Sequence, residues 1–136
     1  MIFLDTTVFV YANIKDYSEH DACLEELQEL VISDELMVNV IVLSECYHIL
    51  STEHKLDKSE VIYRLKGLIK SRKVTYAHIT TETFKRAMKI SEEFNMRIND
   101  AICCACMEEN GIRRILTTNE KHFRKIPWIT VENPLS

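Results

Sequence analysis

Residues 1 to 10 read Met1-Ile2-Phe3-Leu4-Asp5-Thr6-Thr7-Val8-Phe9-Val10, an apolar segment that contains a single carboxylate. The run that precedes Asp5 is typical of a buried strand. An unpaired carboxylate in such a position costs several kcal/mol to ionise. Asp5 therefore needs a partner that compensates its charge.

Three further acids adjoin apolar segments in the same way. They are Glu45 inside Val40-Ile41-Val42-Leu43-Ser44-Glu45-Cys46, Asp100 before Ala101-Ile102-Cys103-Cys104-Ala105, and Glu120 after Ile115-Leu116-Thr117-Thr118. If the fold brings these acids together, a divalent metal ion is the simplest partner that all of them can share. The pattern therefore suggests one metal site.

Composition limits the class of protein. The chain has 136 residues, 46% of them hydrophobic, without a linker, repeat or low-complexity segment, so we expect one domain over residues 1 to 136. The absence of a signal-peptide pattern and of a membrane-length apolar stretch predicts a cytoplasmic protein. Five cysteines in apolar surroundings favour buried, reduced thiols over disulfides. The formal net charge of −4 argues against indiscriminate nucleic-acid binding.

Apolar runs alternate with longer amphipathic stretches along the chain. We predict strands near residues 1 to 5, 36 to 40, 73 to 78, 113 to 117 and 128 to 131. We predict helices near residues 18 to 31, 41 to 54, 57 to 71, 80 to 95, 100 to 109 and 119 to 125. This alternation is typical of an α/β fold with a central, mostly parallel sheet flanked by helices on both faces.

The scarcity of glycine excludes two nucleotide-binding motifs. The only glycines are Gly67 and Gly111, so neither a P-loop nor a dinucleotide-binding fingerprint can be present. ATP and NAD are therefore not expected as ligands. Gly111 instead follows the helix predicted near residues 100 to 109, where a helix C-cap belongs.

Asp5 and Glu45 each have an ordinary structural explanation. Asp5, or a threonine after it, can cap a following helix, but open parallel sheets bind ligands beyond the carboxyl ends of their strands. On a helix, Glu45 shares an apolar face with Ile41 and Ile49. A surface glutamate would lie on the opposite face, so the pattern favours a functional role for Glu45.

Asp100 and Glu120 are less distinctive when each is taken alone. Asn99 or Asp100 can cap the apolar helix that follows, and Glu120 can be an exposed residue of a first helical turn. However, strands near residues 1 to 5 and 113 to 117 would end at the same edge of a parallel sheet. The four acids together therefore favour a shared site.

Other candidate residues are weaker. On one helix Cys103, Cys104 and Cys106 point in different directions, and no second cysteine pair has zinc spacing, so we expect them in the core. The basic residues that we interpret as a solvated helix face are Arg64, Lys66, Lys70, Arg72 and Lys73. Those beside the proposed site, where they would meet phosphate groups, are Lys121, Arg124 and Lys125, together with His122 on position alone.

Four segments, in order, resemble the signature segments of PIN-domain ribonucleases. They are residues 1 to 9, Val42-Leu43-Ser44-Glu45-Cys46-Tyr47-His48-Ile49-Leu50, Asn99-Asp100-Ala101-Ile102 and Leu116-Thr117-Thr118-Asn119-Glu120-Lys121-His122-Phe123. The resemblance spans essentially the whole chain, and its size and spacing are similar to those of the VapC toxins of toxin–antitoxin pairs. It implies a single PIN-like domain whose metal-binding catalytic acids are Asp5, Glu45 and Asp100.

The resemblance also implies supporting roles. Thr6, Thr7 and Thr118 would support the site, although a serine or asparagine is commoner at position 7. Where a fourth aspartate is common, the chain has Asn119 and Glu120. We place Glu120 at the acidic position, while a slip of one residue would place Asn119 there.

Clustered carboxylates without soft ligands suit Mg²⁺ or Mn²⁺, which activates a water molecule. We therefore expect hydrolysis of a phosphodiester bond by one or two ions, with Lys121 or Arg124 in contact with an RNA phosphate. RNA as the substrate, a small antitoxin protein as a partner and a homodimer are implied by the resemblance. The helices near residues 18 to 31 and 41 to 54 are apolar enough to form a partner groove.

Other functions stay open at this point. A haloacid dehalogenase domain also has an aspartate after its first strand but expects a second at position 7, where Thr7 stands. A receiver domain needs adjacent acids before its first helix, which the chain lacks. A PIN-fold RNA-processing nuclease without a toxin role, or a noncatalytic RNA or protein interaction module, would keep the same fold. Metal-dependent nuclease activity that Asp5→Asn abolishes would separate these functions.

Overall fold

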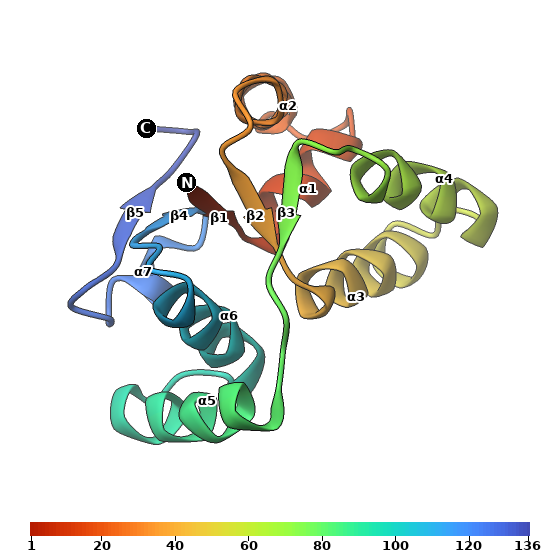
Figure 1. The fold of residues 1–136 in the computed structure, drawn as a ribbon. Helices are drawn as coiled ribbons and strands as arrows, with labels where there is room; N and C mark the ends of the chain where they lie inside the picture. The colour runs from red at the N-terminus through yellow and green to blue at the C-terminus, as the bar shows by residue number, and fades with distance from the viewer.

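The computed structural model describes residues 1–136 and contains one sheet of five strands (Figure 1). The strands are β1 (Ile2–Leu4), β2 (Leu36–Val38), β3 (Val74–Tyr76), β4 (Arg114–Leu116) and β5 (Thr130–Glu132). Their order across the sheet is β3-β2-β1-β4-β5, and every neighbouring pair is parallel. The predicted α/β fold with a parallel sheet is confirmed, and each strand overlaps a predicted one.

Helices follow each of the first four strands. They are α1 (Thr6–Asn13), α2 (His20–Ile32), α3 (Val40–His48), α4 (Lys58–Ile69), α5 (Thr81–Phe94), α6 (Ile98–Glu109) and α7 (Glu120–Phe123), and a π-helical turn, η1 (Ile49–Glu53), extends α3. From the sequence we predict no helix between residues 5 and 18, and α1 shows that this is wrong. Val8 and Val10 are β-branched residues typical of strands, but both are buried in α1, which packs against α2. Tertiary packing therefore overrides the local preference.

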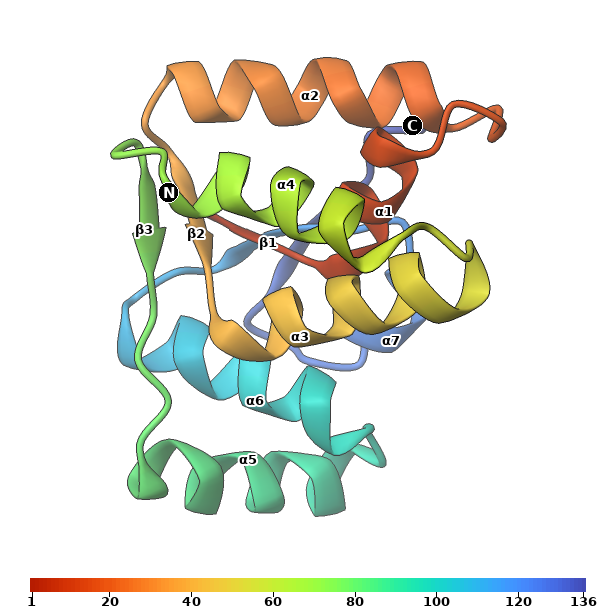
Figure 2. The same cartoon turned by 90° about the vertical axis from the view of Figure 1, so that its right-hand side faces the viewer.

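The helices cover both faces of the sheet. Figure 1 shows α2 on one side of the row of strands and α5 with α6 on the other. Seen from the side, α2, α4, α3, α6 and α5 follow one another across the molecule (Figure 2). The side chains of Ile2, Phe3 and Leu4 are fully buried. The central strand is thus covered on both faces, which explains its unbroken apolar sequence.

Two local features fix the helices that carry site residues. Asn39 caps the N-terminus of α3: its side-chain oxygen accepts a hydrogen bond from the Val42 backbone N–H at 3.0 Å, and its amide nitrogen lies 3.5 Å from the Cys106 sulfur. Gly111 follows α6 with a φ of +66°, a left-handed conformation that favours glycine, as the sequence predicts.

All five cysteines are free and buried, as the sequence predicts. None of the helices combines the length and apolar character needed to cross a bilayer.

Candidate active site

Asp5 and Thr117 follow the two adjacent strands at which the strand order reverses. From β1 the sheet continues through β2 to β3 on one side, and through β4 to β5 on the other. Open parallel sheets bind ligands beyond the carboxyl ends of the strands at such a point. The Thr117 hydroxyl donates a hydrogen bond to Asp5 Oδ2 at 2.7 Å, and the Asp5 backbone N–H donates to the Leu116 carbonyl at 3.0 Å. The pairing of β1 with β4 therefore fixes the Asp5 carboxylate.

The Asp5 carboxylate lies in an environment that disfavours its negative charge. The residue is 5% exposed, and burial raises its pKa from 3.8 to about 6. The hydrogen bond from Thr117 lowers this pKa, whereas the nearby charges of Asp100 and Glu45 raise it. A cation placed among these acids would favour the carboxylate form of Asp5.

Asp100 and Glu45 reach the same region from opposite helices. Asp100 lies in the first turn of α6 and is 4% exposed, so the helix N-terminus favours its negative charge. Glu45 lies on α3 with its side chain 19% exposed, consistent with its position on a largely apolar face. The Thr6 hydroxyl, at the start of α1, donates a hydrogen bond to Glu45 Oε1 at 3.3 Å. Three segments far apart in sequence thus supply neighbouring carboxylates.

Arg97 joins two of these acids. One of its terminal nitrogens lies 3.3 Å from Glu45 Oε2 and 3.2 Å from Asp100 Oδ1, and its Nε lies 3.3 Å from Asp100 Oδ2. The side chain is 62% exposed, so it covers the site from the solvent side. Sequence reasoning missed Arg97, because its neighbours do not distinguish it from a surface residue.

The segment between β4 and α7 places the remaining predicted residues. Glu120 begins α7, and its Oε2 accepts hydrogen bonds from Arg124 at 3.2 and 3.3 Å. The Asn119 backbone N–H donates to the Thr117 hydroxyl at 2.9 Å. The Thr118 backbone N–H donates to the Thr7 hydroxyl at 3.2 Å, which ties this segment to the start of α1. The contacts of Glu120 are thus with Arg124 and not with the other acids. The sequence-based site omits Thr117, although its position after β4 matches that of Asp5 after β1.

A small cavity opens beside Asp100. Its volume is about 100 Å³, and its lining comprises Asn95, Met96, Arg97, Asp100, His122 and Lys125. His122 Nδ1 lies 3.3 Å from Asp100 Oδ2, and Lys125 Nζ lies 3.0 Å from the Asn95 carbonyl oxygen. Lys121 is exposed and makes no ion pair. Three basic side chains, Arg97, His122 and Lys125, therefore line the cavity beside Asp100.

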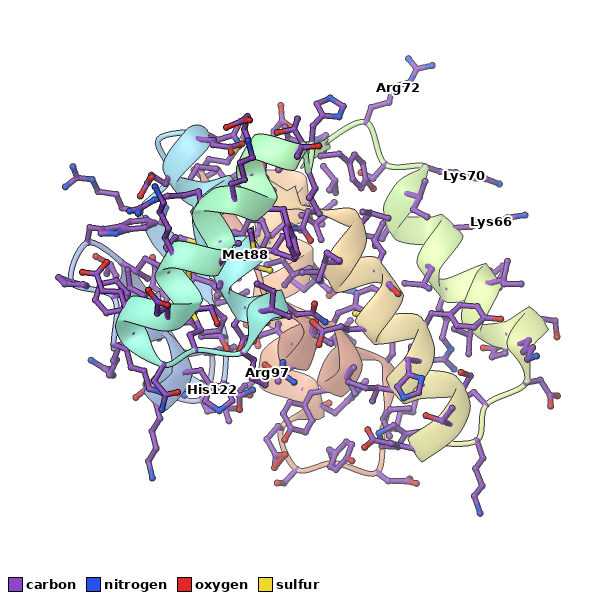
Figure 3. All side chains as sticks on the ribbon, turned by 90° about the horizontal axis from the view of Figure 1, so that it is seen from below. Lys66, Lys70, Arg72, Met88, Arg97 and His122 are labelled. Carbon is purple, nitrogen blue, oxygen red and sulfur yellow. The ribbon has the colours of Figure 1, made fainter.

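The other basic group lies elsewhere. Figure 3 shows Arg97 and His122 near each other, whereas Lys66, Lys70 and Arg72 project outward on another side of the molecule, from α4 and the turn after it. The other two basic residues of this group contact the rest of the chain. Arg64 pairs with Glu60 at 2.9 Å, and Lys73 donates a hydrogen bond to the Ile32 carbonyl at 3.0 Å. Lys66 and Lys70 therefore fit a solvated helix face, whereas Arg72 and Lys73 lie beyond the end of α4 and Arg64 and Lys73 are held by contacts within the chain.

The family model of the PIN domain matches residues 2–129, and this range includes all four predicted acids. The chain belongs to the PIN domain family. No curated protein sequence matches it. The PIN domain assignment confirms the resemblance found in the sequence.

Solved structures similar to this PIN domain include toxins and toxin–antitoxin complexes. VapC20 of Mycobacterium tuberculosis, a sarcin-ricin loop cleaving toxin, has a TM-score of 0.71 at 18% identity, over 85% of this chain and 87% of its own. VapBC2 from Rickettsia felis, bound to a fragment of promoter DNA, has a TM-score of 0.74 at 21% identity over 98% of each chain. VapBC-1 from nontypeable Haemophilus influenzae has a TM-score of 0.73 at 16% identity over 100% of each chain. At these identities the likeness establishes the fold.

The donor set of this PIN domain suits a hard divalent cation. Asp5, Glu45 and Asp100 supply only carboxylate oxygens, the ligands that Mg²⁺ and Mn²⁺ prefer. Asp5 and Asp100 are buried, and Asp5 has a raised pKa that a cation would lower. In the conformation of the structure, no three acidic, histidine or cysteine side chains meet closely enough to hold an ion. Side-chain movement, foremost at Arg97 between Glu45 and Asp100, would be needed to bring the ligands together.

Proposed function

We propose that this PIN domain is a Mg²⁺- or Mn²⁺-dependent endoribonuclease, and that it acts in the cytoplasm as the toxin of a toxin–antitoxin pair. The observation that supports the reaction is that Asp5, Glu45 and Asp100 lie near one another at the switch point of a parallel sheet, with Asp5 within electrostatic reach of the other two and Arg97 bridging those two. The capping alternative for Asp5 is weakened, because its side chain makes no cap hydrogen bond to α1. Two mutually repelling buried acids are costly in a purely structural role.

The carboxylates would hold the ion from several sides. Asp5 and Asp100 would bind it from the sheet and α6, Glu45 from α3, and Glu120 or Asn119 would reach it from α7. When bound, the ion lowers the pKa of a water molecule and stabilises the charge that develops on the phosphate.

Hydroxyl groups of the chain would keep these ligands oriented. Thr117 donates to Asp5 at 2.7 Å and Thr6 donates to Glu45 at 3.3 Å, so each carboxylate retains one oxygen in a fixed direction. Loss of such a hydrogen-bond partner typically lowers metal affinity or activity by about 10- to 100-fold. Thr7 contributes indirectly, because its hydroxyl accepts a hydrogen bond from the Thr118 backbone N–H and so anchors the segment that carries Glu120.

RNA would approach along the basic edge of the site. Lys121 is exposed without an ion pair, and Arg124 would exchange its contact with Glu120 for an RNA phosphate. The cavity beside Asp100 is itself lined by His122 and Lys125. Positive side chains beside an acidic centre bring the phosphate backbone to the ligands without reading its sequence.

The test of the reaction is RNA cleavage by the purified chain with EDTA, Mg²⁺ or Mn²⁺. Wild type should cut only with added metal, and Asp5→Asn or Asp100→Asn should slow cleavage at least about a hundredfold, since even indirect partners of a metal contribute up to that much. Asp16→Asn, an identical charge change at an exposed residue, is the matched control. Cleavage in EDTA, or full activity of folded Asp5→Asn, would contradict the proposal.

An apolar groove supports an antitoxin partner. It has a volume of about 600 Å³ between α1, α2 and α4, and its apolar residues are Phe9, Ala12, Leu24, Leu27, Val31, Ile32 and Leu68. An amphipathic helix can bury its apolar face in such a groove. Of the two helices expected to form a partner groove, the one near residues 18 to 31 contributes as α2, whereas α3 lines none of it.

The homodimer remains part of the proposal. On α5, Phe84 and Met88 lie one turn apart and are 42% and 49% exposed. Met88 is labelled on this helix in Figure 3. Such a pair on an outer helix supports self-association, which light scattering of the purified chain would measure.

The toxin role has its own test. Expression of the chain alone should slow the growth of a bacterial host, and Asp5→Asn should relieve the effect while remaining folded by circular dichroism. Equal toxicity of the folded variant would separate toxicity from catalysis. Absence of toxicity from a wild type that cuts RNA would instead indicate a nuclease outside the toxin role.

A further inference from the structure

Arg97 lies between two of the proposed metal ligands. A single nitrogen of its guanidinium is 3.3 Å from Glu45 Oε2 and 3.2 Å from Asp100 Oδ1. These carboxylates belong to α3 and α6, which approach each other only in the folded chain. A cation of the chain itself therefore holds together two acids that would otherwise repel each other.

The three side chains differ in how firmly they are held. Those of Asp100 and Glu45 are 6% and 19% exposed, whereas that of Arg97 is 62% exposed. Arg97 is the residue just before α6, and its carbonyl oxygen accepts a hydrogen bond from the Ala101 backbone N–H at 3.0 Å, so the backbone is fixed while the side chain lies in solvent. The guanidinium can thus move into solvent while both carboxylates stay in place.

We propose that Arg97 is a built-in counter-ion that competes with the divalent metal for Glu45 and Asp100. This inference rests on the proposed metal site. In the metal-free protein the guanidinium offsets one of the two negative charges of the acid pair and stabilises the fold. Metal binding requires that the guanidinium leave, so Arg97 lowers the affinity of the site for metal.

Asp5 would remain a ligand that Arg97 does not occupy. Its carboxylate accepts a hydrogen bond from the Thr117 hydroxyl, and no hydrogen bond or ion pair joins it to Arg97. The incoming metal would therefore meet a free carboxylate at Asp5 before it displaces the guanidinium. The other basic residue that touches Asp100 is His122, at 3.3 Å, but it does not reach Glu45.

The experiment is calorimetric titration of the full-length protein with Mn²⁺ alone, without RNA. Arg97→Met keeps much of the side-chain length but removes the charge. It should bind Mn²⁺ about three- to tenfold more tightly, the change expected from two partly exposed ion pairs. Arg97→Lys, which keeps the charge but cannot span both carboxylates with one planar group, should give an intermediate affinity.

Arg86→Met is the matched control. Arg86 makes a comparable ion pair with Glu108, at 2.9 and 3.0 Å, near the opposite end of α6 from Asp100. Its removal changes the net charge equally without touching the site, and Mn²⁺ affinity should stay within about twofold of wild type because screening weakens distant charges. Thermal unfolding provides a second readout: Arg97→Met should unfold at a lower temperature in EDTA and recover most of the deficit in saturating Mn²⁺.

Two negative results have different meanings. Mn²⁺ binding that depends on Asp5 but is unchanged or weaker in Arg97→Met would overturn the competition and leave the nuclease proposal intact. Mn²⁺ binding that Asp5→Asn does not weaken would contradict the metal site itself and this inference with it. Tighter Mn²⁺ binding by Arg97→Met, with the Mn²⁺ affinity of Arg86→Met unchanged, would establish the competition.

Discussion

Replacement of Asp5 by asparagine should stabilise the metal-free protein at neutral pH. The Asp5 carboxyl is buried, and its pKa is raised from 3.8 to about 6. The folded protein therefore holds this proton more tightly than the unfolded chain does. Stability is then lost as pH rises between these two values, and the loss is complete above about pH 6.

The size of the effect follows from the pKa. An increase from 3.8 to about 6 corresponds to about 3 kcal/mol of unfolding free energy. Asp5→Asn cannot ionise, and its side-chain oxygen can still accept the hydrogen bond from Thr117. The variant should therefore be more stable than wild type by up to about 3 kcal/mol at pH 7.5, with a melting temperature roughly 10 °C higher. Near pH 4 the two proteins should have nearly equal stability.

Urea unfolding in EDTA between pH 4 and pH 8 measures this difference directly. The exposed residue Asp16 provides the control, because Asp16→Asn changes the same charge without burial. Added Mn²⁺ should reverse the order, since a ligand present at 100 times its dissociation constant stabilises wild type by about 2.7 kcal/mol. A difference between wild type and Asp5→Asn that does not vary with pH would refute the reasoning, as would a more stable metal-free wild type at pH 7.5.

Three further outcomes can be measured with the same protein. Thr117→Val removes the hydrogen bond that lowers the Asp5 pKa, so the pH midpoint of the stability loss should move upward, and Mn²⁺ affinity measured by calorimetry should fall roughly 10- to 100-fold. Asn39→Ala removes the cap of α3 and should lower the unfolding free energy in urea by about 1 to 2 kcal/mol. Burial raises the pKa of Cys104 to about 12 and all five thiols are buried, so a thiol reagent at pH 8 should react slowly with native protein and rapidly after denaturation.

The sequence predicts the sheet because its central strands are buried on both faces and leave unbroken apolar runs. Asp5, Glu45 and Asp100 stand out for the same reason, since each is a charged residue at the end of, or within, such a run. The predicted elements do not include the helix from Thr6 to Asn13, because its β-branched residues give only a weak local preference for a helix. What decides its conformation is packing against α2, which no local pattern records.

The contacts of Arg97 could not be predicted from the sequence around it, for a different reason. Its partner Glu45 lies 52 residues earlier in the chain, on another helix. Nothing in the segment around Arg97 distinguishes an exposed arginine from one that bridges two acids. Long-range pairing of charges is set by the sheet topology, which places α3 and α6 within reach of each other.

Charged residues of this site have opposite effects on the stability of the metal-free protein. Arg97 compensates Glu45 and Asp100, whereas Asp5 keeps most of its burial cost because Thr117 offsets only part of it. Loss of the charge at position 5 should therefore stabilise the metal-free protein, and loss of the charge at position 97 should destabilise it. In Mn²⁺ the sign should reverse at position 5, because the ion needs Asp5, and most of the deficit at position 97 should disappear, because the ion displaces Arg97. A purely structural acid cluster would show the same signs with and without metal.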